Sequence, residues 1–148
     1  IFTGVADVGV GGMLEETPHP RIPIETSADY PRAAAHAANI LRKHGIDGPY
    51  ALVLGPALYE DVFANADDGY PLAKRLRHLV EDRVVRAPEM TGGALVAVRG
   101  GDYQLSLGQD LSIGYASHDA RTVHLFIVES FTFRVLEPAA AVPLQRSG

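Results

Sequence analysis

Residues 103–115 read YQLSLGQDLSIGY, and residues 122–135 read TVHLFIVESFTFRV. In both stretches apolar and polar side chains alternate, which is the period of a β-strand with one apolar face. Only Gln109 breaks the apolar series of the first stretch, and Glu129 interrupts that of the second. A loop at residues 116–119 separates them. The two stretches therefore predict a pair of antiparallel strands that share an apolar face.

The length of these two predicted strands is unusual. Each exceeds ten residues, or roughly 35 Å at about 3.3 Å per residue, whereas a typical strand has about five or six residues. Such strands extend beyond a small core, so their apolar face needs a cover, and neighbouring subunits are the natural one. The candidate subunit-packing residues are Leu107, Leu111, Ile113, Tyr115, Leu125, Ile127, Phe131 and Phe133.

Helical periodicity dominates the middle of the chain. Thr26, Ser27 and Asp29 offer N-cap oxygens, and the apolar residues that follow recur at helical spacing until Gly45, which predicts an amphipathic helix. Pro56 and Pro71 each open a further predicted helix. Short apolar runs bounded by glycine and proline predict strands. These runs are Tyr50–Leu54, Val84–Val85 and Ala94–Val98.

The first part of the chain gives weaker signals. Residues 1–16 are rich in glycine and fit a short helix that runs into a loop. Residues 17–24 contain three prolines and predict an extended connector. Gly100 and Gly101 lie between two predicted strands, where a turn with positive φ requires glycine.

Composition excludes several classes of function. The 148 residues are 47% hydrophobic and 21% charged, so the chain is long and apolar enough to bury a core as one soluble globular body. A formal charge of −5 provides no basic field for nucleic acid or an anionic membrane surface. No run is long enough to span a bilayer. The absence of cysteine excludes disulfides and thiolate chemistry, and a cytosolic location fits.

Reactive side chains do not form a recognisable catalytic or metal site. Ser117, His118 and Asp119 are the residue types of a hydrolase triad, but three consecutive residues cannot adopt the geometry of a triad, and a turn explains them better. The glycine cluster at residues 9–12 lacks the strand and the Lys-Ser/Thr pair of a phosphate-binding loop. The histidines show no compact metal-ligand spacing. They are His19, His36, His44, His78, His118 and His124. We therefore expect no catalytic residue, cofactor or metal.

Asp67 and Asp68 form the most informative polar pair. They lie in the short loop between the second and third predicted helices. On a single subunit this loop is simply solvated. If copies of the chain surround a symmetry axis at this loop, the same carboxylates form a ring of negative charge around an opening, which favours cations.

Four stretches of the sequence resemble the encapsulin family, also called linocin-like or bacteriocin-type shell proteins. They run in family order and cover most of the chain. The stretches are 45–54 (GIDGPYALVL), 69–75 (GYPLAKR), 99–115 (RGGDYQLSLGQDLSIGY) and 129–135 (ESFTFRV). This resemblance implies an α+β, phage-capsid-like (HK97-type) fold.

The resemblance also implies how the chain is divided. Residues 1–28 would be a connector, residues 29–100 the axial domain around a five-fold axis, and residues 101–148 the strands of the peripheral domain with a C-terminal tail. The family's N-terminal arm, E-loop and spine helix have no counterpart in this sequence. That absence, together with a first residue of Ile1 rather than Met, leads us to expect a fragment. The family's five-fold pore loop corresponds to Ala66, Asp67, Asp68, Gly69 and Tyr70.

In function, the resemblance implies a homo-oligomeric shell subunit and not an enzyme. Encapsulin shells are icosahedral nanocompartments of the bacterial cytoplasm that enclose cargo enzymes, typically peroxidases or ferritin-like iron proteins. Such cargo links the family to oxidative stress and iron storage, and short C-terminal targeting peptides capture it. Two alternatives remain open from the sequence. One is a bacteriocin or peptidase activity, and the other is a stand-alone domain that binds a peptide or a different protein on its apolar strands.

Overall fold

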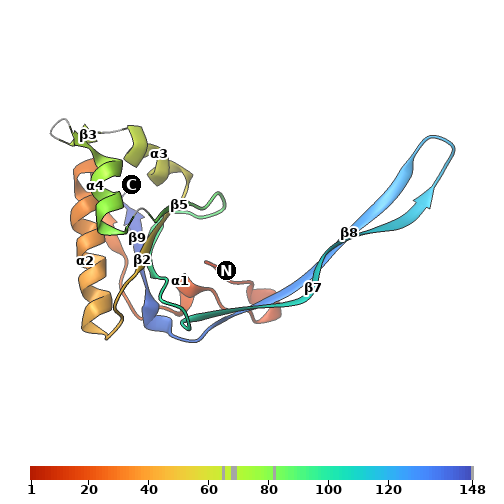
Figure 1. Cartoon of the computed structure of the whole chain (residues 1–148), viewed down its shortest axis with the longest axis horizontal. Helices are drawn as coiled ribbons and strands as arrows, with labels where there is room; N and C mark the ends of the chain where they lie inside the picture. The colour runs from red at the N-terminus through yellow and green to blue at the C-terminus, as the bar shows by residue number, and fades with distance from the viewer. Residues whose placement is uncertain (65, 68–69, 82, 148) are drawn as a thin grey trace.

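A computed structural model shows a folded body from which one long hairpin projects (Figure 1). The structure describes residues 1–64, 66–67, 70–81 and 83–147. Both termini lie at the body, and the tip of the hairpin lies far from it (Figure 1). The body therefore contains the hydrophobic core, and the hairpin is an appendage to it.

The body is built on a five-stranded sheet in the order β1-β9-β6-β2-β5. β2 runs parallel to β5 and antiparallel to β6, which is itself antiparallel to β9, and β1 runs parallel to β9. Its strands are β1 (Ile22–Ile24), β2 (Tyr50–Leu54), β5 (Val84–Arg86), β6 (Gly93–Ala97) and β9 (Ala141–Arg146). The first and last of these strands in the sequence are thus neighbours in space.

Helix α2 (Tyr30–Lys43) covers one face of the sheet. Its start is fixed by a capping box in which Thr26 and Asp29 exchange backbone and side-chain hydrogen bonds around η2 (Ser27–Asp29). Gly45, at φ 73°, allows the left-handed conformation that follows the helix. The helix predicted from the N-cap residues is confirmed.

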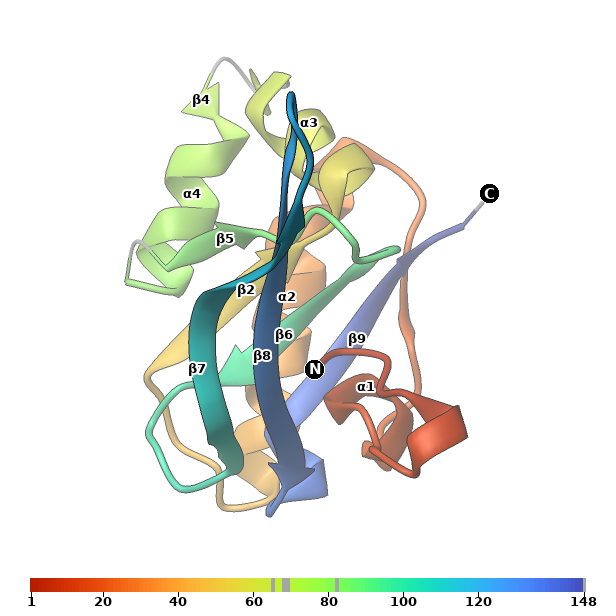
Figure 2. The same cartoon turned by 90° about the vertical axis from the view of Figure 1, so that its right-hand side faces the viewer.

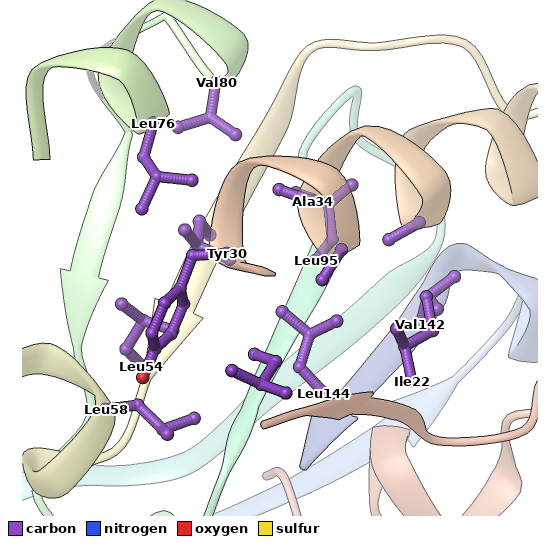
Figure 3. Close-up of a cluster of buried hydrophobic side chains, with 14 of the residues drawn as sticks. Ile22, Tyr30, Ala34, Leu54, Leu58, Leu76, Val80, Leu95, Val142 and Leu144 are labelled. Carbon is purple, nitrogen blue, oxygen red and sulfur yellow. The ribbon is translucent and has the colours of Figure 1, made fainter. Parts of the chain in front are cut away.

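Helices α3 (Pro56–Ala64) and α4 (Leu72–Leu79) lie on the same side of the sheet as α2. Figure 3 shows the packing, in which side chains of all three helices meet those of the strands. Leu54, Leu95 and Leu144 of the sheet are no more than 2% exposed, as are Tyr30 and Leu76 of the helices. The close packing of branched side chains at this interface is the main source of stability of the body.

A second, smaller cluster lies on the other face of the sheet. Val53 and Val96 point to this face, because side chains alternate along a strand, and they pack with Met13 of α1 (Met13–Glu16). Phe2 and Val10 add partly buried side chains from either side of η1 (Ala6–Val8). The glycine-rich start of the chain thus covers part of the sheet.

The hairpin consists of β7 (Tyr103–His118) and β8 (Val123–Val135), paired with each other and with no other strand of the described residues. Its base is closed by Asp102, whose carbonyl oxygen accepts hydrogen bonds from the backbone N–H groups of Leu136 and Glu137. The chain then passes through η3 (Pro138–Ala140) into β9. The two long antiparallel strands predicted from the alternation are confirmed.

The expected boundaries at residues 28 and 100 stay a prediction. Two segments outside the expected axial range nevertheless complete the sheet of the body. Ile22–Ile24 had been expected in a connector and Ala141–Arg146 in a tail, yet they form β1 and β9. They do so because their apolar side chains are buried against α2.

Candidate assembly surfaces

The hairpin carries a broad apolar face that nothing in the described chain covers. The pairs Leu107–Phe131, Ile113–Ile127 and Tyr115–Leu125 stand opposite one another on the two strands, so their side chains share this face. Each of these six side chains is between 57% and 69% exposed. Leu105, Leu111 and Val123 add to the exposed apolar surface of the hairpin. We call these nine side chains the apolar hairpin face.

Two β-bulges in the hairpin remove Gln109 from the apolar hairpin face. The pairing shifts between Leu107 and Gln109, and it shifts again between Gln109 and Ser112. Gln109 therefore stands opposite Ser130 and donates a hydrogen bond to the Ser112 hydroxyl at 3.1 Å. An extra residue in one strand moves the following side chains to the other face. The expectation that Gln109 breaks the apolar face is wrong, because a bulge at Gly108 turns it to the polar side.

The opposite face of the hairpin is more polar. Gln104 stands opposite Arg134, and Ser106 stands opposite Thr132. Gly114 stands opposite Phe126, whose ring occupies the space that a side chain at Gly114 would need. The two faces therefore differ in chemistry, and only one of them is a continuous apolar surface.

Two aromatic residues at the base of the hairpin belong to the body. Phe133 is only 6% exposed, stacks with Tyr103 at a centroid distance of 6.1 Å and packs in the second core cluster. Phe133 therefore does not share the exposure of the other candidate subunit-packing residues, because β8 reaches the body at this point. Burial, followed by the nearby charge of Asp102, raises the pKa of Tyr103.

An ion pair spans the turn at which the hairpin leaves the body. The Arg99 guanidinium donates to both carboxylate oxygens of Asp102, with Nη2 to Oδ1 at 2.9 Å and Nε to Oδ2 at 3.0 Å. Arg99 also donates to the carbonyl oxygen of Gly45 at 3.1 Å. Gly100 and Gly101 between them have φ of 89° and 85°, as the turn prediction requires. A bidentate pair of this kind limits rotation of the turn.

The short strand β4 (Tyr70–Pro71) lies at one end of the body, next to α4 (Figure 2). The backbone of β3 (Ala66–Asp67) pairs in antiparallel fashion with that of β4. Asp68 and Gly69 lie outside the described residues. The ring of carboxylates around an opening therefore stays a prediction.

Ser117, His118 and Asp119 do not form the hydrogen-bonded arrangement of a catalytic triad. The Asp119 carboxylate accepts hydrogen bonds from the backbone N–H groups of Arg121 and Thr122, and His118 contacts the hydroxyl of Tyr115. These contacts shape the tip of the hairpin. Within the described ranges, no group of three or more His, Cys, Asp or Glu could hold a metal ion. In the same ranges no helix is long and apolar enough to cross a membrane.

The sequence model of the Linocin_M18 family, described as "Encapsulating protein for peroxidase", matches residues 1–132. The chain belongs to this family. A type 1 encapsulin shell protein of Rhodospirillum rubrum is 42% identical over 98% of this chain. Those of Brevibacterium linens and Mycobacterium tuberculosis are 42% and 36% identical over 97% of it. The chain spans 52% to 55% of the length of these relatives.

Solved structures of a virus-like particle and a phage share the fold of this chain. A virus-like particle from Pyrococcus furiosus superimposes with a TM-score of 0.63 at 19% identity, and the match covers 84% of this chain and 56% of that one. A structure titled Gordonia phage Cozz gives a TM-score of 0.58 at 14% identity, with 95% of this chain and 53% of that one covered. The expected phage-capsid-like α+β fold is confirmed, as is the resemblance to encapsulins.

Proposed function

We propose that the protein is a structural subunit of an encapsulin nanocompartment, an icosahedral shell that packs from copies of the same chain and performs no catalysis. The observation that carries this proposal is the apolar hairpin face. Isolated soluble proteins rarely expose apolar patches beyond a few hundred Å². Six paired apolar side chains of the hairpin are each more than half exposed, so another molecule is expected to cover this face.

The shape of the molecule supports the same role. A body that can gather around an axis, with an arm that reaches away from it, provides contacts at two separate places on each subunit (Figure 1). Closed shells need such multiple contacts, because each subunit must touch several neighbours. The peripheral hairpin would hold neighbouring groups together, and the body would surround the five-fold axis.

The loop at residues 66–70 is proposed as the opening of the shell. Asp67 and Asp68 would repeat around the axis and form a ring of negative charge. Such a ring attracts cations and repels anions at close range. Small cations would therefore enter the compartment more readily than small anions of the same size.

The shell would enclose a cargo enzyme in the bacterial cytoplasm. On the printed description of the family, a peroxidase is the first candidate. A ferritin-like iron protein is the second, and a short targeting peptide at the C-terminus of the cargo would bind inside the shell. Neither nucleic acid nor a membrane is a proposed partner, in line with the charge of −5.

Electron microscopy and light scattering of the protein expressed from its complete gene test the shell role. We expect closed particles of uniform size. Ile113→Lys with Ile127→Lys should abolish them, because two ammonium groups on the apolar hairpin face would have to be buried without partners. Asn39→Lys on the exposed side of α2 is the matched control and should leave particles intact. A small, uniform wild-type species that never forms particles would refute the shell role.

A protease assay on particles freed of cargo tests the non-catalytic part of the proposal. We expect no hydrolysis of casein above that of buffer. Activity that follows the particles through purification and is lost in His118→Ala would favour the peptidase alternative instead.

A further inference from the structure

A pocket opens where the start of α3 meets the end of β9. It has a volume of about 230 Å³, and four separate segments of the chain form it: the residue before β1, the start of α3, the loop before β6 and the end of β9. Its lining includes Arg21, Ala57, Thr91, Gly92, Gln145 and Arg146. We call it the α3/β9 pocket. No side chain of the apolar hairpin face contributes to it, so it is separate from the proposed assembly surface.

Backbone hydrogen bonds hold these segments in place. The N–H group of Gly55, just before α3, donates to the carbonyl oxygen of Gly92 at 2.8 Å, so the loop before β6 lies against the start of α3. Beyond the other end of β9, the N–H group of Ser147 donates to the carbonyl oxygen of Ile24 at 2.9 Å and extends the parallel pairing of β9 with β1. The pocket is therefore bounded by paired backbone of the folded body.

The polar side chains of the pocket all carry hydrogen-bond donors, and two of them are cationic. Arg21 and Arg146 supply guanidinium groups, Thr91 supplies a hydroxyl and Gln145 an amide. Among the described residues, no carboxylate lines the pocket. The whole chain has 18 acidic against 13 basic residues, so this pocket differs in charge from the rest of the molecule. A local positive potential of this kind attracts anions.

The two arginines are at most partly engaged within the chain. Arg21 makes no ion pair or hydrogen bond with any residue that the structure describes. Arg146 lies 3.7 Å from Asp61, which is longer than a charge-assisted hydrogen bond, and its side chain is 54% exposed. Asp61 also accepts a hydrogen bond from the Tyr30 hydroxyl at 3.0 Å. Most N–H donors of both guanidinium groups are therefore available to a ligand.

The start of α3 adds backbone donors to those of the side chains. Its first residue, Pro56, has no N–H group, and the next two, Ala57 and Leu58, line the pocket. The N–H group of Tyr59 already donates to the carbonyl oxygen of Gly55 at 2.9 Å. N–H groups in the first turn have no acceptor within their helix, and they favour negative charge nearby. The helix start thus strengthens a preference that the two arginines establish.

We infer that the α3/β9 pocket binds a phosphate group, with Arg21 and Arg146 on its oxygens and with Thr91 and Gln145 donating further hydrogen bonds. Guanidinium groups donate two N–H bonds at once to phosphate oxygens. Donors that come from four segments surround a tetrahedral group better than they surround a planar carboxylate. The charge of the pocket disfavours a cation. This inference goes beyond the shell function and does not depend on it.

Isothermal titration calorimetry of the protein from its complete gene, with inorganic phosphate as the probe, tests the pocket. We expect binding at millimolar concentrations in a phosphate-free neutral buffer. Arg21→Gln and Arg146→Gln should each weaken this binding about tenfold, because each removes charge-assisted hydrogen bonds. Arg42→Gln, on the exposed side of α2, removes the same charge outside the pocket and should change the affinity less than about twofold.

Unchanged affinity in Arg21→Gln, or no binding by the wild type, would overturn the inference. Arg21 has no partner among the described residues, so this variant should fold normally, and circular dichroism without phosphate checks that it does. Arg146→Gln also removes the ion pair with Asp61 and therefore serves as the second variant.

Competition identifies the form in which phosphate binds. Displacement of inorganic phosphate by glycerol 3-phosphate would assign the pocket to the phosphate group of a small organic compound, and failure of glycerol 3-phosphate to compete would assign it to the free ion. Chloride at the same ionic strength should not compete. Equal competition by chloride would show a non-specific cationic surface and would contradict the inference. Either result leaves the shell function intact, because particle formation is measured separately by electron microscopy.

Discussion

Phe131 and Phe133 lie two residues apart in β8 and point to the same side of the strand, yet they have different surroundings. Phe133 is 6% exposed, whereas Phe131 is 57% exposed. The alternating sequence pattern predicts the same environment for both residues. The difference arises because β8 enters the body between these two positions and brings Phe133 against Tyr103 and the second core cluster.

Alanine at each of these positions separates the two roles. Phe133→Ala should lower the free energy of unfolding by about 3 kcal/mol, because it leaves a cavity in packed surroundings. Phe131→Ala should change it by less than about 0.5 kcal/mol in the isolated chain, since its ring is in water. Urea denaturation followed by circular dichroism measures both values. Equal losses at the two positions would show that the hairpin packs against the body along more of its length.

Tyr30 should make the free energy of unfolding fall as the pH rises above 10. Burial, and then the hydrogen bond that its hydroxyl donates to Asp61 at 3.0 Å, raises the pKa of Tyr30 above its ordinary value. The unfolded chain therefore loses this proton near pH 10 while the folded chain keeps it, so stability is complete below pH 10 and falls above it. The slope should approach about 1.4 kcal/mol per pH unit. Denaturation at several pH values from 8 to 11 measures it.

Tyr30→Phe is the matched variant for this pH dependence. It should cost about 1 kcal/mol at pH 8 through the lost hydrogen bond. It should also show a shallower fall in stability above pH 10 than the wild type. An unchanged slope would mean that Tyr103, whose pKa is also raised by burial, or another group carries the alkaline effect.

At the scale of elements, the hairpin combines regular pairing with bulges that sort its side chains. The bulges return Leu111 and Ile113 to the apolar side after Gln109 has been turned away from it. This arrangement lets strands of 16 and 13 residues keep one apolar face, although their sequences are not perfectly alternating. It also leaves that face open to any apolar molecule in solution.

A hydrophobic dye should report this exposure in the isolated chain. Replacing Leu111, Ile113 and Ile127 by threonine should lower the fluorescence of bound anilinonaphthalene sulfonate by about half or more, since threonine keeps strand propensity but is more polar. Ser106→Thr with Ser112→Thr on the opposite face should leave the signal unchanged. A signal that survives the first set of substitutions would place the dye elsewhere on the molecule.

The sequence predicted most of these elements but not all. The helices that begin near Asp29, Pro56 and Pro71 and the two long strands all have several periods of clear pattern, which is why they could be predicted. The bulges could not, because a shift in pairing depends on the partner strand rather than on the residue that is displaced. The assignment of residues 66–70 to a pore loop came from the resemblance alone and stays a prediction.

For the whole molecule, β9 is the strand that joins distant parts of the chain. It lies between β1 and β6, and its residues Ala141, Val142 and Leu144 are at most 2% exposed. The sequence did not predict it, because the segment is short, contains Pro143 and has its parallel partner at residues 22–24. Only the three-dimensional arrangement shows that this segment is central to the sheet.

Deletion of residues 141–148 should therefore abolish cooperative unfolding, because β1 would be left without a paired strand, β6 would lose one of its two partners, and the core would open to water. Deletion of residues 147–148 alone should leave a cooperative transition, since the strand pairing of β9 stays intact and, among the described residues, the deletion removes the backbone hydrogen bond that Ser147 donates to Ile24. Thermal unfolding followed by near-ultraviolet circular dichroism distinguishes the two. A cooperative transition in the shorter chain would mean that the remaining strands suffice.

The position of β9 near the end of this sequence also determines when the five-stranded sheet can form during translation. During translation the hairpin can form from neighbouring residues as soon as it leaves the ribosome, whereas the sheet must wait until Arg146 has been added and emerges. Each nascent chain therefore passes through a stage in which the apolar hairpin face is exposed and the five-stranded sheet has not yet formed. Binding of a molecular chaperone to the apolar hairpin face during that interval would keep the hairpins of neighbouring nascent chains from associating with one another.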